Sequence, residues 1–174
     1  SDKTGTLTQN RMSVRRLWLG DGFFTPQDIA TEPRLVVDHL ALFVNAALCH
    51  NLKEVNHQGR PRWLGDPMEV ALVAMGHDAA GSLDHFVRLD EIPFDTDRKR
   101  MSVRCDTPQG AMLYCKGALE TVLAACDFVQ IGGATVPLDA AAKTQLLAAQ
   151  DEMAGAGLRV LAFAHAPAPD GLPD

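Results

Sequence analysis

The sequence predicts an α+β fold in which a twisted antiparallel β-sheet is flanked by helices. First, three short runs with strand alternation follow one another in the middle of the chain, at residues 88–92, 100–105 and 111–116. Second, residues 106–110 (DTPQG) have the composition of a turn between the last two runs, which predicts an antiparallel hairpin. Third, segments rich in helix formers stand on both sides of these runs, as is typical of an α+β domain.

The chain before these runs is expected to contain a strand, a loop and a helix. Residues 11–19 (RMSVRRLWL) have strand character, and Asp21-Gly22 is typical of a hairpin turn. Residues 27–34 are expected to form a loop. Residues 35–48 are rich in helix formers and carry a broad apolar face, which predicts a helix.

A second helix is expected to begin at Asp66. This aspartate is a favourable N-cap, Pro67 suits the first helical turn, and Glu69 stands at the capping-box position. A short helix is also expected over residues 83–87.

Helix and strand are expected to alternate again after the central runs. In chain order we expect a helix over residues 117–126, a strand over 128–131, a turn at Gly132-Gly133, a helix from an N-cap at Asp139 to about Ala154, and a strand over 158–164. Gly155 and Gly157 supply the stop signal for the long helix.

Length and charge suit one domain, or one domain with an appendage. The chain has 174 residues, of which 47% are hydrophobic and 22% charged, an ordinary globular balance. Its formal net charge is -6, and its longest basic cluster is residues 98–100. A broad nucleic-acid surface needs a wide basic field, so nucleic acid is not an expected partner. A nucleotide ligand needs only one or two well-placed cations, so this charge balance is compatible with one.

The cysteines and the apolar segments bear on location. None of the four cysteines forms a C-x-x-C pair, which favours neither a zinc ribbon nor a thioredoxin motif and suits reduced thiols in a cytosolic domain. The longest apolar stretch, residues 40–49, is shorter than the roughly 20 residues that cross a bilayer. We therefore expect no direct membrane contact by this domain.

The most specific string is DKTGTLT, residues 2–8. The carboxylate of Asp2 could attack a γ-phosphorus and form an aspartyl-phosphate. The adjacent Lys3 and the hydroxyl of Thr4 are the kinds of group that help to hold a transferring phosphoryl group and Mg²⁺.

Four further strings are GDPMEVAL (65–72), PFDTDRKRMSV (93–103), YCKGALE (114–120) and GLRVL (157–161). Taken together and in this order, the five strings resemble the P-type cation-transporting ATPases, nearly from end to end of the chain. The first of the four is similar to the calcium-pump-like class, and the next two are also similar to the magnesium-transporter class. The heavy-metal class reads its nucleotide with a His-Pro pair, and none of the six histidines here precedes a proline.

The resemblance implies a role for particular residues. Asp2 would be the phosphorylated nucleophile, with Lys3 and Thr4 lining the phosphate site, and Asp2 and Thr4 would hold Mg²⁺. Three ATP-binding residues would contact the base: Glu69 would accept a hydrogen bond from the adenine amino group, Phe94 would stack on the ring, and Met101 would pack near it. Lys116 would lie deep in the pocket, and Gly117 would stand where ligand and backbone approach each other. Arg159 would face the ribose and the phosphates. Base–aromatic stacking alone is worth about 1–3 kcal/mol.

Several of these residues also have a purely structural explanation. Glu69 is also where a capping box places a carboxylate, and the two roles can coexist. A lone phenylalanine after a proline is more often a core residue than a stacking platform. Lys116 and Gly117 could simply end a strand and start a helix, and Arg159 could be a surface arginine.

The resemblance also implies a parent protein and boundaries. Residues 1–10 would begin the phosphorylation domain, 11–165 would form the nucleotide-binding domain, and 166–174 a linker or tail. No GDGxND-type motif occurs, so the chain is interpreted as a cytoplasmic piece of an integral membrane pump whose phosphorylation, actuator and transmembrane domains are its partners. Such a piece is expected to bind ATP or ADP weakly and to show no turnover.

Two alternative functions fit the sequence less well. A soluble phosphatase of the haloacid dehalogenase superfamily shares the nucleophilic aspartate, but places a second acid two positions on, where this chain has Thr4. A non-catalytic regulatory domain would not need the adenine-pocket residues.

Overall fold

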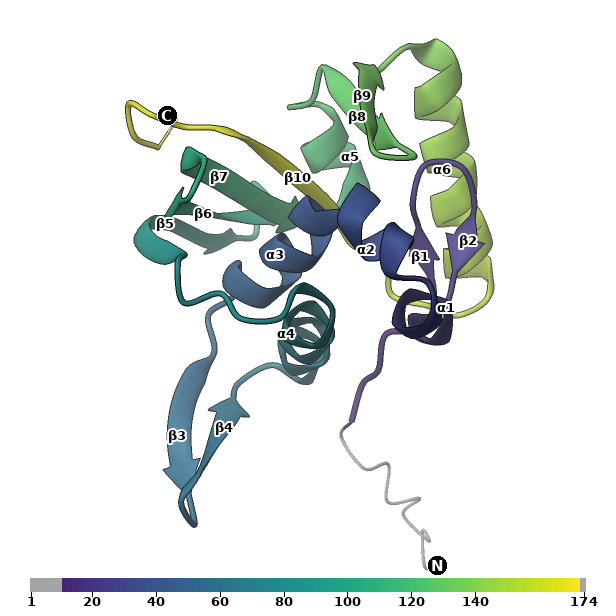
Figure 1. Ribbon diagram of the computed structural model, residues 1–174. Coiled ribbons are helices and arrows are strands. Elements are labelled where there is room, and N and C mark those ends of the chain that lie inside the picture. The colour runs from purple at the N-terminus through teal and green to yellow at the C-terminus, as the bar shows by residue number, and fades with distance from the viewer. Residues whose placement is uncertain (1–10, 173–174) are drawn as a thin grey trace, which may run out of the picture.

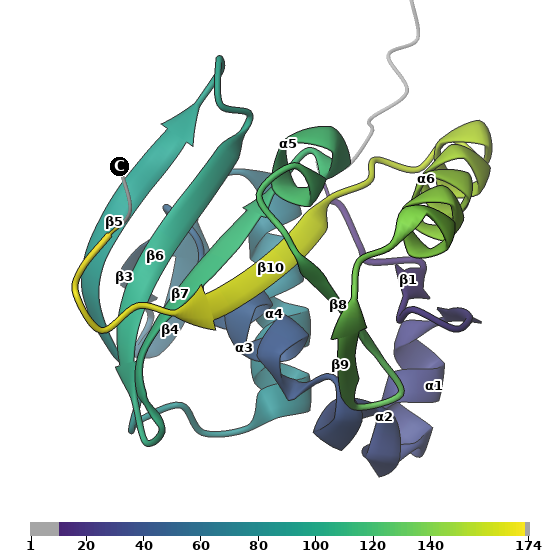
Figure 2. The same ribbon diagram turned by 90° about the horizontal axis from the view of Figure 1, so that it is seen from above.

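The computed structural model describes residues 11–172, and its centre is a four-stranded antiparallel sheet (Figures 1 and 2). The strand order is β10-β7-β6-β5. The strands are β5 (Val87–Asp95), β6 (Arg100–Thr107), β7 (Gly110–Gly117) and β10 (Ala162–Pro167). The α+β class and the antiparallel sheet are confirmed, and the predicted turn at 106–110 joins β6 to β7 with Thr107 opposite Gly110.

Helix α3 (Leu40–Leu48) packs on one face of this sheet, against β7 and β10, and α4 (Pro67–Ala80) packs against α3 on the same side (Figure 2). The core between them and the sheet contains Val44, Cys49, Met101, Val103, Cys105 and Tyr114. The β6 members of this cluster are alternate residues, so the period-2 pattern of the strand sets its buried face.

Helix α3 is held to the sheet by a buried amide. Asn45, 1% exposed, donates from Nδ2 to the carbonyl oxygens of Cys115 (2.9 Å) and Ala164 (3.0 Å). These carbonyls belong to neighbouring strands β7 and β10, so one side chain fixes the helix against both.

The start of α4 follows the sequence prediction in part. The Asp66 carboxylate accepts from the Met68 amide at 2.8 Å, and Pro67 is the first helical residue, as predicted. The predicted capping box does not form, because the Glu69 carboxylate is bound to Lys116 and to the Asn51 amide instead.

The amino-terminal part contains a short hairpin of β1 (Leu17–Trp18) and β2 (Phe23–Phe24), closed by the Leu19 amide donating to Gly22 at 3.2 Å. The predicted turn at Asp21-Gly22 is confirmed, although the strand is shorter than residues 11–19.

The predicted loop at 27–34 is wrong, because two helices occupy it: α1 (Pro26–Thr31) and α2 (Pro33–Asp38). Thr25 and Asp28 form a reciprocal capping box ahead of α1, and a proline opens each helix. These local signals outweigh the turn-like composition.

Two predicted helices are altered. The one over 35–48 is divided at His39, a buried residue with φ -126° and ψ 29° that ends α2 and precedes α3. The one over 83–87 is absent, and a turn takes its place, in which the Phe86 amide donates to Leu83 at 2.9 Å.

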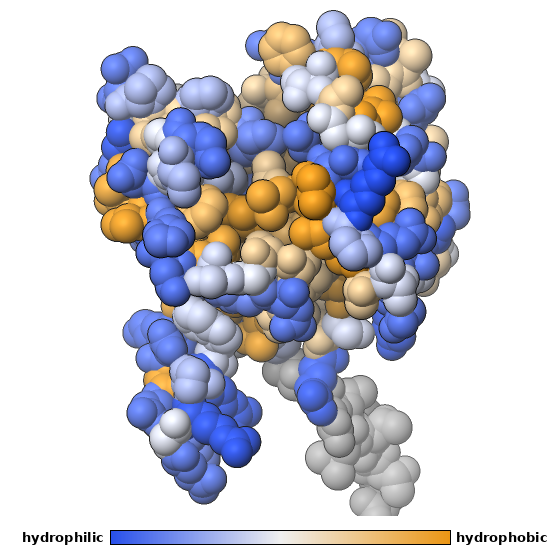
Figure 3. All heavy atoms as spheres, in the orientation of Figure 1, coloured by the Kyte–Doolittle hydropathy of each residue, from blue (hydrophilic) through white to orange (hydrophobic). Residues whose placement is uncertain are grey.

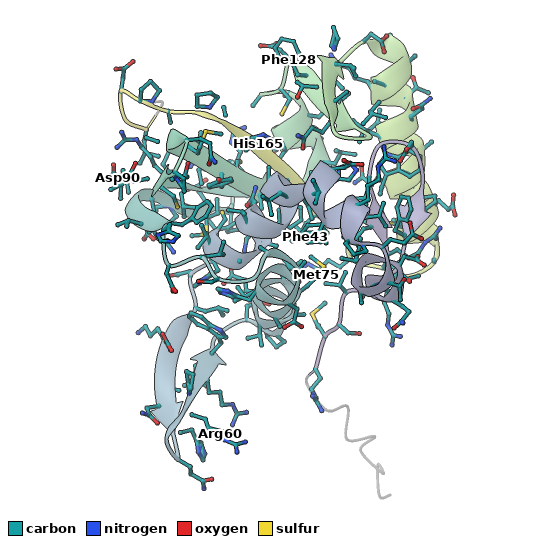
Figure 4. All side chains as sticks on the ribbon, viewed as in Figure 1. Phe43, Arg60, Met75, Asp90, Phe128 and His165 are labelled. Carbon is teal, nitrogen blue, oxygen red and sulfur yellow. The ribbon has the colours of Figure 1, made fainter. Side chains whose placement is uncertain are left out.

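A second hairpin projects from the body (Figures 1 and 3) and consists of β3 (Lys53–His57) and β4 (Arg60–Leu64). These strands pair with each other and with no other strand of the described chain. The turn has φ 53° at Gln58 and φ 79° at Gly59, the left-handed pair of a two-residue hairpin loop. Arg60 lies near its tip (Figure 4).

The carboxyl-terminal half contains α5 (Leu119–Leu123), β8 (Phe128–Ile131), β9 (Ala134–Pro137) and α6 (Ala140–Gly155). The strand at 128–131, the Gly132-Gly133 turn and the long helix are confirmed, with Asp139 as the N-cap that accepts from Ala142 at 2.8 Å. The predicted helix over 117–126 is shorter, and the last strand begins at Ala162 rather than at 158. None of the helices described is long and apolar enough to span a bilayer.

Candidate functional site

An ion pair between the buried Lys116 and the half-buried Glu69 joins α4 to the sheet. Lys116 Nζ lies 2.8 Å from Glu69 Oε1, and the two side chains are only 6% and 14% exposed. Lys116 is the penultimate residue of β7, and Glu69 lies in the first turn of α4. Two charges out of water are tolerated when paired and hydrogen-bonded, so the pair fixes the helix start against the end of the strand.

The second oxygen of Glu69 is also occupied. Glu69 Oε2 accepts from the Asn51 amide at 3.2 Å. Cys49, fully buried nearby, donates from Sγ to the Met101 carbonyl oxygen at 3.6 Å, and burial raises the pKa of this thiol to about 12. The thiol therefore stays protonated and neutral beside the ion pair.

The sheet register brings most of the predicted binding residues to one end of the sheet. Met101 is directly opposite Lys116 across β6 and β7, so the two share one face. Asp95 is opposite Arg100, and Arg100 is opposite Gly117, which places the Phe94 end of β5 at the same edge. Met101 is 2% exposed and Lys116 is 5% exposed, whereas Phe94 is 60% exposed. Phe94 is thus not a core residue.

The turn after Phe94 is tightly built. Asp95 Oδ1 accepts from the amides of Asp97 (2.8 Å) and Arg98 (2.9 Å), and these bonds lower the pKa of the carboxyl. Lys99 has φ 53°, and a side chain at Gly117 would strike its carbonyl oxygen. The close approach at Gly117 is therefore to the backbone of this turn.

Arg159 is an exposed residue in the connection from α6 to β10. Because Ala162 is opposite Gly117, the connection enters the sheet at the Lys116 end. Arg159 therefore belongs to the same end of the molecule as the other candidates.

The remaining predicted residues, Asp2, Lys3 and Thr4, lie outside the described residues. Within residues 11–172, no group of three or more His, Cys, Asp or Glu side chains could hold a metal ion.

Two shallow hollows lie elsewhere, against α6. One of about 180 Å³ is lined by Trp18, Phe23, Gln145, Ala148, Ala149 and Glu152. The other, of about 300 Å³, is lined by Glu120, Leu123, Ala124, Lys143 and Leu147. Neither is lined by a predicted binding residue.

An exposed aromatic ring, a buried cation and a carboxylate at one sheet end suit a flat aromatic ligand that carries anionic groups. The ring offers a stacking face, the carboxylate accepts hydrogen bonds from an amino group, and the cation attracts negative charge. The sequence did not single out Asn51, whose backbone amide donates to Glu69 and which no side-chain pattern reveals, or His50, which follows α3 by two residues.

Comparison with known proteins defines the class. The family model described as "P-type ATPase, cytoplasmic domain N" matches residues 39–173, and the chain belongs to this family. The fold fits, since its sheet is antiparallel and covered by helices.

Individual relatives are transport ATPases. The chain is 33% identical over 169 residues to a calcium-transporting ATPase of Listeria monocytogenes, 35% over 182 residues to the sodium/potassium-transporting ATPase subunit alpha-2 of Gallus gallus, and 32% over 174 residues to calcium-transporting ATPase 1 of Lactococcus lactis. These alignments cover 95%, 95% and 98% of this chain but 19%, 18% and 19% of the relatives. The chain thus spans about a fifth of their length.

Proposed function

We propose that this chain binds ATP or ADP at the end of the sheet that carries Lys116. The observation that carries the proposal is the Glu69–Lys116 ion pair at the same end of the sheet as the exposed Phe94. The side chain of Phe94 is 60% exposed, so it adds little to the stability of the fold. A base stacked on this ring would add about 1–3 kcal/mol to the free energy of nucleotide binding.

Each residue has a distinct task in this proposal. Phe94 stacks on the adenine ring, and Glu69 accepts a hydrogen bond from its amino group. Lys116 and Arg159 attract the phosphates, while Met101 packs near the base. Gly117 allows the turn that carries Phe94 to approach β7.

In the whole protein the bound ATP would serve cation transport. A carboxylate oxygen of Asp2 would attack the γ-phosphorus, forming an aspartyl-phosphate and releasing ADP. Lys3 and Thr4 would line this phosphate site, and Asp2 and Thr4 would hold Mg²⁺. Family membership favours this over a haloacid dehalogenase-type phosphatase or a regulatory domain.

The same proposal covers the domains and the location. Residues 1–10 would belong to the phosphorylation domain, 11–165 to the nucleotide-binding domain and 166–174 to a linker or tail. The partners would be the phosphorylation, actuator and transmembrane domains of a membrane pump, with this domain on the cytoplasmic side. Alone, the chain would bind nucleotide weakly, without sustained turnover.

Titration of the isotope-labelled chain with ATP, followed by amide chemical shifts, tests the binding site. We expect shifts around Phe94 and Lys116, and we expect Phe94→Ala to weaken binding about tenfold, since stacking is worth about 1–3 kcal/mol. Phe94 is exposed, so this variant should fold normally.

Asp2→Ala is the matched control and should change nucleotide affinity by less than twofold. Absence of shifts near Phe94 and Lys116, or an equal loss in both variants, would contradict the proposed site. Steady-state ATP hydrolysis by the purified chain would contradict the expected lack of turnover.

A further inference from the structure

Residues 49–52, which follow α3, connect three elements around Glu69. The Cys49 thiol donates a hydrogen bond to the Met101 carbonyl oxygen on β6. The His50 carbonyl oxygen accepts a hydrogen bond from Arg88 Nη1 on β5 at 2.7 Å. The Asn51 amide donates to Glu69 on α4. The 49–52 segment is therefore fixed at each of its first three residues.

His50 holds this segment from within. Its Nδ1 accepts from the Leu52 amide at 3.0 Å, and its ring packs edge-on against Trp63 with centroids 5.0 Å apart. The residue is 8% exposed. Burial, reinforced by Arg88, lowers the pKa of the imidazole to about 4, so it is neutral at pH 7 and Nδ1 is free to accept.

The two donors on Glu69 differ in what they can do when nucleotide arrives. Lys116 is a flexible side chain, and under the proposed function its charge is drawn toward the phosphates. The Asn51 amide belongs to the backbone and cannot turn away while the 49–52 segment keeps its shape. This amide is then the donor that keeps the carboxylate aimed at the base.

We infer that His50 is a positioning residue for base recognition: through the 49–52 segment it holds the Asn51 amide on Glu69. The inference rests on the proposed function. It predicts that His50 acts on the discrimination between bases more than on phosphate binding. Adenine offers an amino donor to Glu69, whereas guanine presents an acceptor oxygen at the same place.

Two variants separate the acceptor from the ring. His50→Phe keeps a ring against Trp63 but removes the acceptor for the Leu52 amide. His50→Asn loses the ring but places an oxygen close to the Nδ1 position. We expect His50→Phe to weaken ATP binding about tenfold while changing GTP binding less than twofold, and His50→Asn to restore ATP binding to within about threefold of the wild type.

The readouts are ATP and GTP affinities from chemical-shift titration of the full chain, together with hydrogen exchange at the Asn51 amide. The amide should be protected in the wild type and in His50→Asn, and exchange freely in His50→Phe. An unchanged ratio of ATP to GTP affinity in a folded His50→Phe would overturn the inference.

The test remains decisive if His50→Phe fails to fold. An unprotected Asn51 amide in the wild type would by itself overturn the inference, whatever the variant does. Failure of the wild type to bind ATP would overturn the proposed function as well, whereas normal ATP binding with no effect at His50 would overturn this inference alone.

Discussion

Glu69 and Lys116 depend on each other more than any other charged pair in the described chain. Each of the other ion pairs in the described chain includes a side chain that is at least 44% exposed. Surface pairs of that kind contribute about 0–1 kcal/mol. Removing one partner of a buried pair is more damaging, because the other charge is left uncompensated.

We therefore predict that Lys116→Met lowers the free energy of unfolding by about 3–5 kcal/mol. The double variant Glu69→Gln/Lys116→Met should recover part of this loss, since no unpaired charge remains. Urea denaturation followed by circular dichroism measures both. A loss below about 1 kcal/mol for Lys116→Met would show that water reaches the pair and that it is not buried in solution.

The candidate residues could be found from the sequence, but their contacts could not. The motifs GDPMEVAL and YCKGALE identified Glu69 and Lys116, yet nothing in a linear pattern states that they meet across 47 positions. Glu69 was also expected to cap its own helix. The pairing with buried Lys116 outweighs that local bond, because an unpaired buried ammonium would cost more than an unsatisfied helix-end amide.

Helices α3 and α4 cross closely at Gly76, where backbones rather than side chains meet. A Cβ added there would lie 2.5 Å from the Ala47 amide nitrogen and 2.6 Å from the Phe43 carbonyl oxygen. Phe43 and Met75 lie close by, next to this crossing (Figure 4). Since α4 carries Glu69, this crossing also sets the position of the candidate site.

We predict that Gly76→Ala destabilises the protein by about 1–3 kcal/mol, the typical cost of overpacking a core. Gly155→Ala is the matched control: it is also helical, but an added Cβ meets nothing within 4 Å. It should stabilise the protein by up to about 1 kcal/mol, because alanine is the better helix former. Thermal unfolding distinguishes the two, and equal shifts of the melting temperature would contradict the crossing described here.

Elements with an apolar pattern were predictable, and elements without one were not. The alternation in β6 and β7 and the Asp139 N-cap of α6 gave correct elements. The β3–β4 hairpin has little apolar alternation and carries Pro61, which in a sequence argues against a central strand. It can form because it has no neighbours beyond its own partner strand in the described sheets.

Two buried histidines, His39 and His50, make stability depend on pH. Burial lowers the pKa of each below the ordinary 6.5, and for His50 to about 4. Between these values the unfolded chain binds more protons than the folded one. The contribution to stability is therefore complete above pH 6.5 and is lost as the pH falls toward 4.

We predict that the urea midpoint falls between pH 6.5 and 4, and that His50→Asn shows a shallower fall. The groups whose charges act on His50 are Arg88, Glu69, Lys116 and His77, and the variant leaves them all in place. Midpoints measured at half-unit intervals of pH give the slope. Parallel curves for the two proteins would show that His50 does not contribute to it.

Trp63, at the base of the projecting hairpin, gives the molecule a built-in optical probe. Its indole packs edge-on against the His50 ring and stacks on the His77 ring. The residue after His50, Asn51, donates its amide to Glu69, so the indole is linked to Glu69 through residues 50 and 51. The only other tryptophan, Trp18, belongs to β1, where its buried indole N–H has no hydrogen-bond partner among residues 11–172. Trp18→Phe removes that donor and leaves Trp63 as the single tryptophan, whose fluorescence can follow events at the candidate site without any added label.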